Sequence, residues 1–232
     1  MSSSFIPHPS DFLFDYPKSA AFGRVLPKSR IYAHANPGKK LRGRFVSQVD
    51  QIVWRYKLAP ETVRLAARPG VSEIQIFEVA LREPDLDHDV LRAIDRAIPS
   101  PILFELSFGA QIKVTATYKR PNEADPSKWV VGDYYGTDWL PADTQRKPLP
   151  VALDLAGLYE QMLRALIAEP PRRGESLKDQ VERMARIHGM QMEYDKMELR
   201  LRNEKQFNRK VEINSKMRSI KSSIKQMRQA KS

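Results

Sequence analysis

Hydrophobic and polar residues alternate most regularly between residues 102 and 119. In "ILFELSF" and "QIKVTATYK" every second residue is apolar: Ile102, Phe104, Leu106, Phe108, Ile112, Val114, Ala116 and Tyr118. A period of two residues is typical of strands that bury one face. The sequence therefore predicts a β-hairpin here, with Gly109 in its turn.

The alternation also predicts the register of this hairpin. A three-residue loop, 108–110, would pair Leu106 with Ile112 and keep one face apolar. A two-residue loop would instead place Leu106 opposite Lys113 and mix the two faces. With the longer loop, Glu105 lies opposite Lys113, and we expect an exposed ion pair worth less than about 1 kcal/mol.

Other stretches predict the rest of a mixed domain. The expected elements are a helix from about residue 40 to 59, a strand over 72–81, a helix over 85–98, a fourth strand over 129–140 and a helix over 153–168. Residues 1–40 lack clear periodicity and are interpreted as an irregular arm with short turns. The prediction is an α+β fold with a small, mainly antiparallel sheet and flanking helices.

The segment "EPPRRGES", residues 169–176, separates this domain from a helical extension. No proline follows it, so we predict an α+β domain over residues 1–170 and a basic helical extension over residues 171–232. Apolar residues recur in the extension at alternating steps of three and four, as in a coiled coil. They are Ile187, Met190, Tyr194, Met197 and Leu201, and then Ile213, Met217, Ile220, Ile224 and Met227.

The phase of this repeat slips between residues 203 and 208. The slip fits either a stutter in one long helix or the turn of an antiparallel hairpin. We favour one long helix because the junction contains neither glycine nor proline.

Charge is concentrated at the C-terminal end. The chain of 232 residues has a net charge of +11. Residues 200–232 hold eleven Lys and Arg against two acids, a net charge of +9, and residues 1–199 hold 28 against 26. The basicity therefore belongs to the helical extension rather than to the globular domain.

The composition excludes several classes of chemistry. The chain has no cysteine, which excludes disulfides, thiolate nucleophiles and Cys-ligated zinc. The start "MSSSFIPHPSDF" lacks the features of a secretory signal, and charges interrupt the most apolar stretch, "VALDLAGLYEQMLRALIA". We expect a soluble cytoplasmic protein with no membrane partner.

Motifs for catalysis or cofactors are weak. The sequence has no phosphate-binding loop, no GxGxxG, no HExxH and no nucleophile elbow, so we expect no cofactor. His88 has acidic neighbours, but these fit a capped helix start better than a metal site. We therefore assign no metal ligands.

One catalytic alternative stays open. The predicted order of helix, three strands and helix over residues 87–168 is similar to the core of PD-(D/E)XK nucleases, whose acids bind a divalent cation. Glu105, Lys119 and Asp133 are the candidate residues, although no D/E-x-K motif falls on a central strand. Pairing of Glu105 with Lys113 is the simpler interpretation, so an active nuclease is the competing hypothesis.

Four aromatic residues, Trp129, Tyr134, Tyr135 and Trp139, lie in the fourth predicted strand. They could form a base-stacking platform. Large aromatics in strands more often pack in the core or at an edge of the sheet, and the sequence leaves both readings open.

The extension carries the two main candidate surfaces. An apolar set is predicted to dock on a partner: Phe207, Val211, Ile213, Met217, Ile220, Ile224 and Met227. A basic set is predicted to contact nucleic acid: Lys205, Arg209, Lys210, Arg218, Lys221, Lys225 and Arg228. The cations flank the apolar seam, which disfavours self-pairing and suits an acidic partner helix, the chain's own segment 193–198 or a phosphate backbone.

Six segments together resemble a bacterial family known as domain of unknown function 4391. They are "FDYPKSAAFGRVLPKSRIYAHA", "QVDQIVWRYKLAPETVRL", "EIQIFEVAL", "AIDRAIPSPILFEL", "YKRPNEADPSKWVVGDYYGTDWLP" and "EKQFNRKVEIN". The resemblance implies a small protein encoded beside DNA methyltransferases and helicases in restriction-like phage-defence clusters, with no established catalytic residues. Our hypothesis is a non-enzymatic accessory subunit of such a complex, which docks on a helicase or methyltransferase and contacts DNA through its basic helix. Besides a divergent nuclease, a stand-alone nucleic-acid-binding protein is the other alternative.

Overall fold

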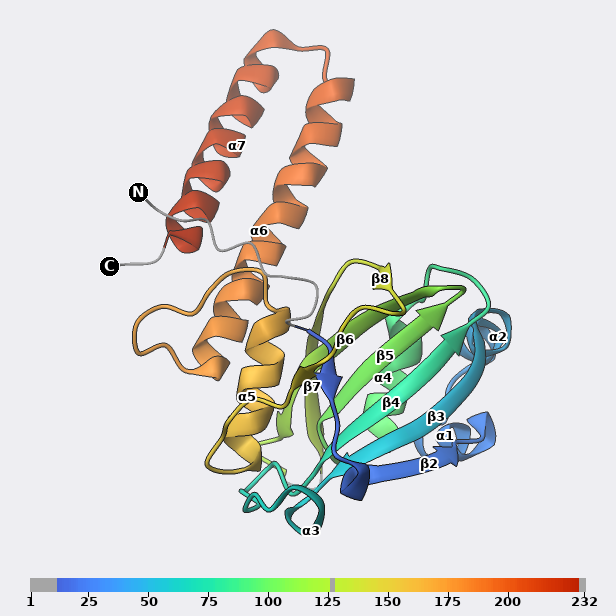
Figure 1. Cartoon of the computed structure of the whole chain (residues 1–232). Helices are drawn as coiled ribbons and strands as arrows, with labels where there is room; N and C mark the ends of the chain where they lie inside the picture. Colours follow the sequence, from blue (N-terminus) through green and yellow to red (C-terminus); the bar gives the residue numbers. More distant parts are fainter. Residues whose placement is uncertain (1–11, 126–127, 230–232) are drawn as a thin grey trace. The chain divides into compact units, whose positions relative to one another are not determined.

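The computed structural model describes residues 12–125 and 128–229 (Figure 1). The chain forms two compact units, which we call the sheet unit (Met1–Ala168) and the hairpin unit (Glu169–Ser232). The strands are β1 Phe14–Asp15, β2 Ala21–Val25, β3 Val49–Leu58, β4 Ile74–Leu81, β5 Ile102–Phe108, β6 Gln111–Pro121, β7 Trp129–Gly136, β8 Leu140–Pro141 and β9 Lys147–Pro148. The helices are the 3-10 turn η2 Lys18–Ala20, α1 Lys28–Ala35, α2 Lys39–Gln48, α3 Pro60–Val63, α4 His88–Ala97, α5 Leu155–Leu166, α6 Leu177–Asn203 and α7 Phe207–Arg228.

The sheet unit is built on one twisted sheet in the order β2-β3-β4-β5-β6-β7, with β8 added beside β6. All of its neighbouring strands are antiparallel except β4 and β5, which are parallel and are joined through α4. A separate parallel pair joins β1 to β9. The predicted α+β class with a mainly antiparallel sheet and flanking helices is confirmed.

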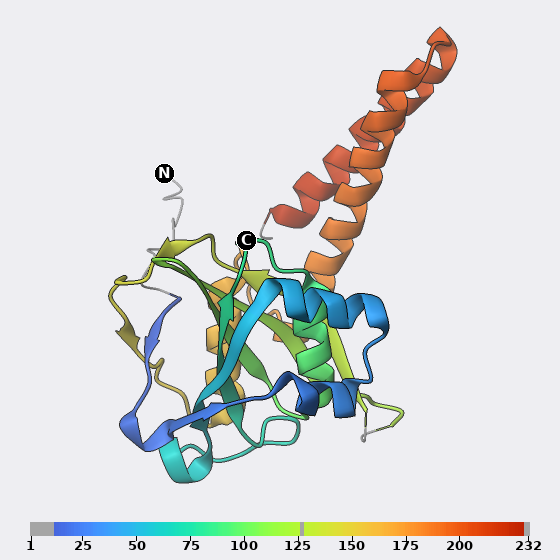
Figure 2. The same cartoon turned by 90° about the vertical axis from the view of Figure 1, so that its right-hand side faces the viewer.

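Both faces of this sheet are covered. Figures 1 and 2 show α4 on one face and α5 on the other. On the α4 side, Phe45, Phe77 and Phe104 are almost fully buried. On the other side, Leu158 and Met162 of α5 are equally buried. Strands with two covered faces need not alternate between apolar and polar residues.

This double coverage explains why the predicted hairpin register is wrong. The turn has two residues, Gly109 and Ala110, and Leu106 pairs with Lys113. Gly109 has a φ of +57°, a left-handed conformation that glycine adopts without strain. Our prediction assumed one solvated face, whereas Leu106 and Glu105 on consecutive positions are both buried.

The helix predicted from residue 40 to 59 is only half correct. Residues 39–48 form α2, and the chain then turns directly into β3. β3 lies between β2 and β4 and contributes buried Val49, Ile52 and Leu58 to the core. Its run of branched and aromatic residues favours a strand, and this preference was hidden by helix-like spacing that continued across the boundary.

The predicted irregular arm is also partly wrong. Residues 12–40 include β1, β2 and α1, and the part of the arm before residue 12 lies outside the described residues. Helices at 88–97 and 155–166 match the predictions closely, and Asp87 caps the first of them by accepting a hydrogen bond from the Asp89 backbone N–H at 2.8 Å. Among the described helices, none combines the length and apolar character needed to span a membrane.

The hairpin unit contains two helices instead of the single helix that we favoured. α6 and α7 are separated by three residues, 204–206, and contact one another along their lengths as antiparallel neighbours (Figures 1 and 2). The hairpin was the alternative that the phase slip had left open.

Candidate functional site

The turn of the hairpin is formed by a carboxylate rather than by glycine or proline. Oε1 of Glu204 accepts hydrogen bonds from the backbone N–H groups of Lys205 and Gln206, both at 2.9 Å. These bonds hold the pKa of Glu204 below its ordinary value. They satisfy donors that a continuous helix would have used, so the chain leaves α6 and re-enters a helix at Phe207. An acid within the phase slip was the available signal for this turn.

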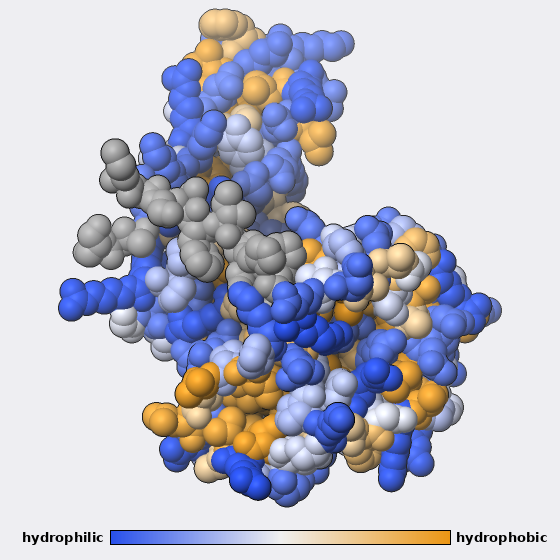
Figure 3. Space-filling model, in the orientation of Figure 1, coloured by the Kyte–Doolittle hydropathy of each residue, from blue (hydrophilic) through white to orange (hydrophobic). Residues whose placement is uncertain are grey.

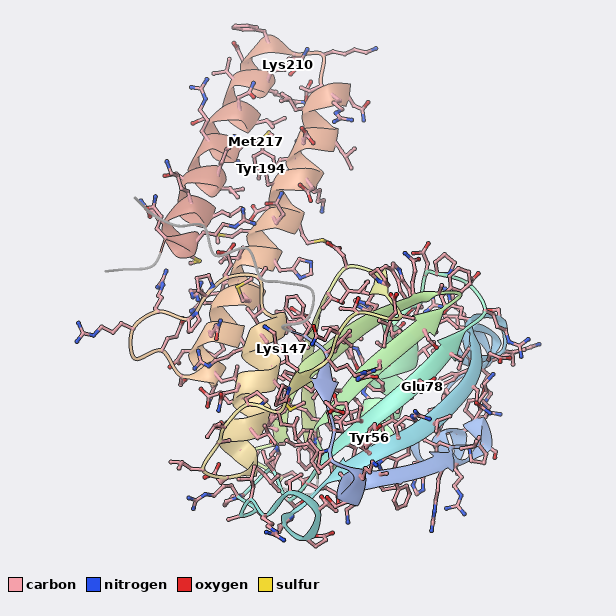
Figure 4. The ribbon with its side chains drawn as sticks, in the orientation of Figure 1. Tyr56, Glu78, Lys147, Tyr194, Lys210 and Met217 are labelled. Atoms are coloured by element: carbon pink, nitrogen blue, oxygen red, sulfur yellow. The ribbon has the colours of Figure 1, made fainter. Side chains whose placement is uncertain are left out.

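The apolar seam of α7 is covered by α6 of the same chain. Ile213, Met217 and Ile224 are 8%, 7% and 6% exposed. Figure 4 shows Met217 and Tyr194 in the space between the two helices. Burial of these side chains provides most of the stability of a helix pair of this size. Three of the residues that we predicted as partner anchors are therefore used inside the hairpin.

Two other predicted anchors have the opposite environment. Phe207 is 77% exposed and Val211 is 53% exposed, both within the first turns of α7. They follow the tip of the hairpin and are the members of the docking set that a partner could reach without opening the helix pair.

Buried arginine contacts fix the base of the hairpin. Arg183 on α6 is 3% exposed and binds both carboxylate oxygens of Glu175, at 2.8 and 2.9 Å. Arg183 also donates to the backbone carbonyl of Met227, as does Arg172 at 3.0 Å. Met227 lies in the last turn of α7, where unpaired carbonyls favour cations. The bidentate contact with Arg183 lowers the pKa of Glu175 to about 2.

All seven cations predicted to contact nucleic acid are exposed. Because an α-helix turns by about 100° per residue, five of them lie on one side of the α7 seam. We call this set the basic flank: Lys210, Arg218, Lys221, Lys225 and Arg228. Arg209 lies on the opposite side of the seam, together with Lys216, and Lys205 lies in the turn.

Most of the basic flank has no acidic partner. Within residues 12–125 and 128–229, no carboxylate forms an ion pair with Lys210, Arg218, Lys221 or Lys225, whereas Arg228 pairs with Glu169 at 3.3 Å. Figure 3 shows a mainly hydrophilic surface on the visible side of the hairpin, with scattered apolar residues. Apart from Arg228, the flank is therefore a surface of uncompensated positive charge.

A groove of about 500 Å³ lies between the two helices of the hairpin, beside the C-terminal part of the basic flank. Gln191 and Tyr194 of α6 line one wall, and residues of α7 line the other. The α7 wall contains Lys221, Ile224, Lys225 and Arg228. Sequence reasoning identified the cations but not the groove, because the groove exists only once the helix has folded back on itself.

The candidate nuclease residues are not brought together. Glu105 points to the face of the sheet that carries α5, whereas Lys119 reaches Asp95 on α4 across the opposite face. Asp133 lies on β7 within an irregularity of the β6–β7 register. No metal-binding group of three His, Asp or Glu residues occurs in the described part of the chain.

Glu105 pairs with an arginine that the sequence did not indicate. Arg146 binds both carboxylate oxygens of Glu105, at 2.8 and 2.7 Å, and also donates to the Phe14 carbonyl at 3.0 Å. The expected ion pair with Lys113 is therefore wrong. The Arg146 contacts join the central strand to β1, and the neighbouring Tyr16 hydroxyl has a pKa raised by burial and by Glu105.

Lys119 is an internal cap for α4. Its ammonium donates to the backbone carbonyls of Asp95, Ile98 and Ser100 and lies 3.5 Å from Oδ1 of Asp95. The Tyr134 hydroxyl donates to the other Asp95 oxygen at 2.5 Å. Burial lowers the pKa of Lys119 to about 8 and raises that of Asp95 to about 6. This network pairs the backbone carbonyls at the C-terminal end of α4 with the Lys119 ammonium, which is therefore used inside the fold.

Most of the four aromatic residues considered for a base-stacking platform have packing roles instead. Tyr134 belongs to the Asp95 network, the ring of Trp129 lies 5.5 Å from the Lys119 ammonium, and Trp139 packs against the core on the α4 side. These contacts account for three of the four rings by packing.

The structure thus defines an α+β protein whose sheet is stabilised by paired internal charges and whose helical hairpin exposes unpaired ones. A family model described as "Domain of unknown function (DUF4391)" matches residues 14–224, and the chain belongs to this family. The match includes both units. No curated protein and no solved structure matches the chain. The association with phage-defence clusters stays a prediction.

Proposed function

We propose that this chain is a non-enzymatic accessory subunit that contacts nucleic acid through the basic flank of its hairpin. One observation carries the proposal. The apolar seam of α7 is covered by α6, while Lys210, Arg218, Lys221 and Lys225 remain exposed and without acidic partners among the described residues.

This arrangement favours a phosphate backbone over a partner helix. A partner helix would need the seam at Ile213, Met217 and Ile224, which is already buried. A phosphate backbone needs cations along an accessible edge, and release of its counterions provides the driving force. From Lys210 to Arg228 the helix rises by about 27 Å, which corresponds to roughly eight nucleotides along one strand of B-form DNA.

The sheet unit supports the accessory role. Its buried charged side chains are paired, as Lys119 is with Asp95 and Glu105 is with Arg146. A catalytic acid or base must instead reach a substrate proton. A helicase or methyltransferase of a bacterial defence complex is the partner that we propose from the family resemblance, and its reaction would supply the enzymatic activity.

Direct binding of the full-length protein to fluorescent oligonucleotides tests the proposal. Anisotropy should show binding that weakens steeply with salt, and Lys221→Gln with Lys225→Gln should reduce the affinity at least about tenfold at moderate salt. The matched control is Lys39→Gln with Lys40→Gln, which removes the same charge from exposed positions of α2 in the sheet unit. Equal losses in both variants, or no binding by the wild type at low salt, would reject the basic flank as the site.

The exposed tip supports a second candidate function, docking on a protein. Phe207 is 77% exposed at the first residue of α7, and large aromatics often anchor interfaces in a partner's pocket. Phe207→Ser in a tagged full-length chain, expressed with its genomic neighbours and purified after nuclease treatment, should lose a bound partner. Retention of that partner would exclude the tip as the docking site, and loss of the wild-type association on nuclease treatment would show that nucleic acid is the bridge.

A further inference from the structure

The groove along the basic flank combines two kinds of surface. Tyr194 presents an aromatic ring from α6, and Ile224 of α7 also lines the groove, although only 6% of it is exposed. Lys221, Lys225 and Arg228 place positive charge along the same wall. Figure 4 shows Tyr194 on the side of α6 that faces α7, so the ring lies at the groove and not on the outer surface of the hairpin.

The spacing of the cations suits a polyanion that runs along the helix. With a rise of about 1.5 Å per residue, Lys221 and Lys225 are about 6 Å apart along the axis and Arg228 lies about 4.5 Å further. None of the residues that line the groove is acidic. Near the groove, Asp195 of α6 accepts a hydrogen bond from the Gln191 amide at 2.9 Å, and Glu169 pairs with Arg228 at 3.3 Å.

We propose that this groove binds single-stranded nucleic acid, with phosphates on Lys221, Lys225 and Arg228 and a base stacked on Tyr194. The inference rests on the proposed function and adds strand selectivity to it. A duplex can offer phosphates to the basic flank, but its bases are stacked on one another and cannot reach the ring. A single strand can supply both, and stacking on an aromatic side chain tolerates any base.

A flat organic anion explains the whole lining better than an acidic peptide does. Carboxylates would satisfy the cations, but they would leave the Tyr194 ring without a matching surface. A nucleotide has a planar base that can stack on a ring, and one sugar joins this base to the charged phosphate. The groove volume of about 500 Å³ is large enough for such a group.

The test compares two substitutions of one residue in the full-length protein. Tyr194→Phe keeps the ring, and Tyr194→Leu keeps apolar volume but removes the ring. Anisotropy is measured with a labelled oligothymidine of about 20 nucleotides, which does not pair with itself, and with a duplex of equal length. Unlabelled polyglutamate of similar charge serves as the acidic-peptide competitor, and helix content is checked by circular dichroism.

We expect Tyr194→Leu to weaken single-strand binding by about tenfold and Tyr194→Phe to retain it, with duplex binding unchanged in both. Unchanged single-strand binding in Tyr194→Leu, equal loss for strand and duplex, or displacement by polyglutamate as efficient as displacement by unlabelled oligothymidine would overturn the inference. These results are distinct from failure of the proposed function, in which the wild type binds neither nucleic acid at low salt.

Discussion

The two units use the same residue types for opposite purposes. In the sheet unit the side chains of Lys119 and Asp95 are fully buried and contact each other. In the hairpin unit Lys221 and Lys225 are exposed and no described carboxylate pairs with them. Charge that is enclosed and paired positions the backbone, whereas exposed and unpaired charge is available to a ligand. The contrast indicates that a ligand is to be sought on the hairpin unit.

The largest effect is expected from Lys119→Met. The substitution removes the donor of three buried backbone carbonyls and the cation beside Asp95, whose carboxylate keeps only the Tyr134 hydroxyl as a side-chain donor. Removing one partner of a buried ion pair costs about 3–5 kcal/mol. Urea unfolding followed by tryptophan fluorescence reports this loss selectively, since Trp54, Trp129 and Trp139 all lie in the sheet unit.

Lys128→Met is the matched control for that measurement. Lys128 pairs with Asp125 at 3.0 Å, but its side chain is 74% exposed. We expect a change within about 0.5 kcal/mol in the free energy of unfolding. Similar losses in both variants would show that the buried network contributes no more than a surface ion pair.

The next effect concerns the seam of the hairpin. Ile224→Asp places a carboxylate in a site that is 6% exposed, which should destabilise the hairpin by about 3 kcal/mol. Val211→Asp introduces the same side chain where 53% of the residue is exposed, and we expect almost no change. Helix content by circular dichroism and amide hydrogen exchange in α6 and α7 measure both. An intact hairpin in Ile224→Asp would mean that α6 does not cover the seam.

The elements that sequence could predict are those whose local pattern agrees with their final surroundings. α4 has a capping aspartate, an apolar face and a following Pro99, and its helix was predicted within a few residues. β3 was misread because its spacing fits either period, and only pairing with β2 and β4 decides between them. The predicted register of the β5–β6 hairpin was wrong for a related reason. It assumed one exposed face, and whether both faces of the sheet are covered depends on the whole unit.

The candidate site was predicted in its composition but not in its arrangement. Alternating apolar spacing and neighbouring cations identified both faces of α7 from the sequence. The function of each face depends on whether the apolar seam packs on a partner's helix or on α6. The sequence does not decide this, because residues 203–208 fit either one long helix or a hairpin. Arg146 lies far from Glu105 along the chain, and Tyr194 reaches the groove only after the turn at Glu204. Such contacts between distant residues have no local signal.

A pH-dependent effect of moderate size is expected at the base of the hairpin. The pKa of Glu175 is lowered to about 2 in the folded state because Arg183 binds it. A carboxyl with a depressed folded-state pKa stabilises the fold fully above its ordinary pKa near 4.5, and this contribution is lost as the pH falls through about 2. Glu175→Gln should therefore destabilise the hairpin on the order of 2 kcal/mol at pH 6, and less at pH 3.

Thermal unfolding of the hairpin, monitored by circular dichroism at several pH values, measures this difference. Glu160→Gln is the control, because Glu160 also pairs with an arginine at 2.7 Å but its side chain is 44% exposed and belongs to the sheet unit. A difference between wild type and Glu175→Gln that stays constant from pH 6 to pH 2.5 would contradict the assigned cause.

The smallest effect gives the sharpest comparison, because it separates the two sides of one helix. Lys225 belongs to the basic flank, whereas Lys216 lies on the other side of the α7 seam, and both are exposed. Each substitution by glutamine removes one charge from the same helix, so a general loss of net charge would affect binding equally. If phosphates contact only the basic flank, Lys225→Gln should reduce the slope of log affinity against log salt by about 0.7 for a single strand, and Lys216→Gln should leave it unchanged. The measurement is a titration of the full-length protein with oligothymidine at four or more salt concentrations. Equal changes in slope would show that nucleic acid is held by the overall charge of the hairpin. The two units would then still differ in whether their charges are buried or available, but the two sides of α7 would not differ in binding.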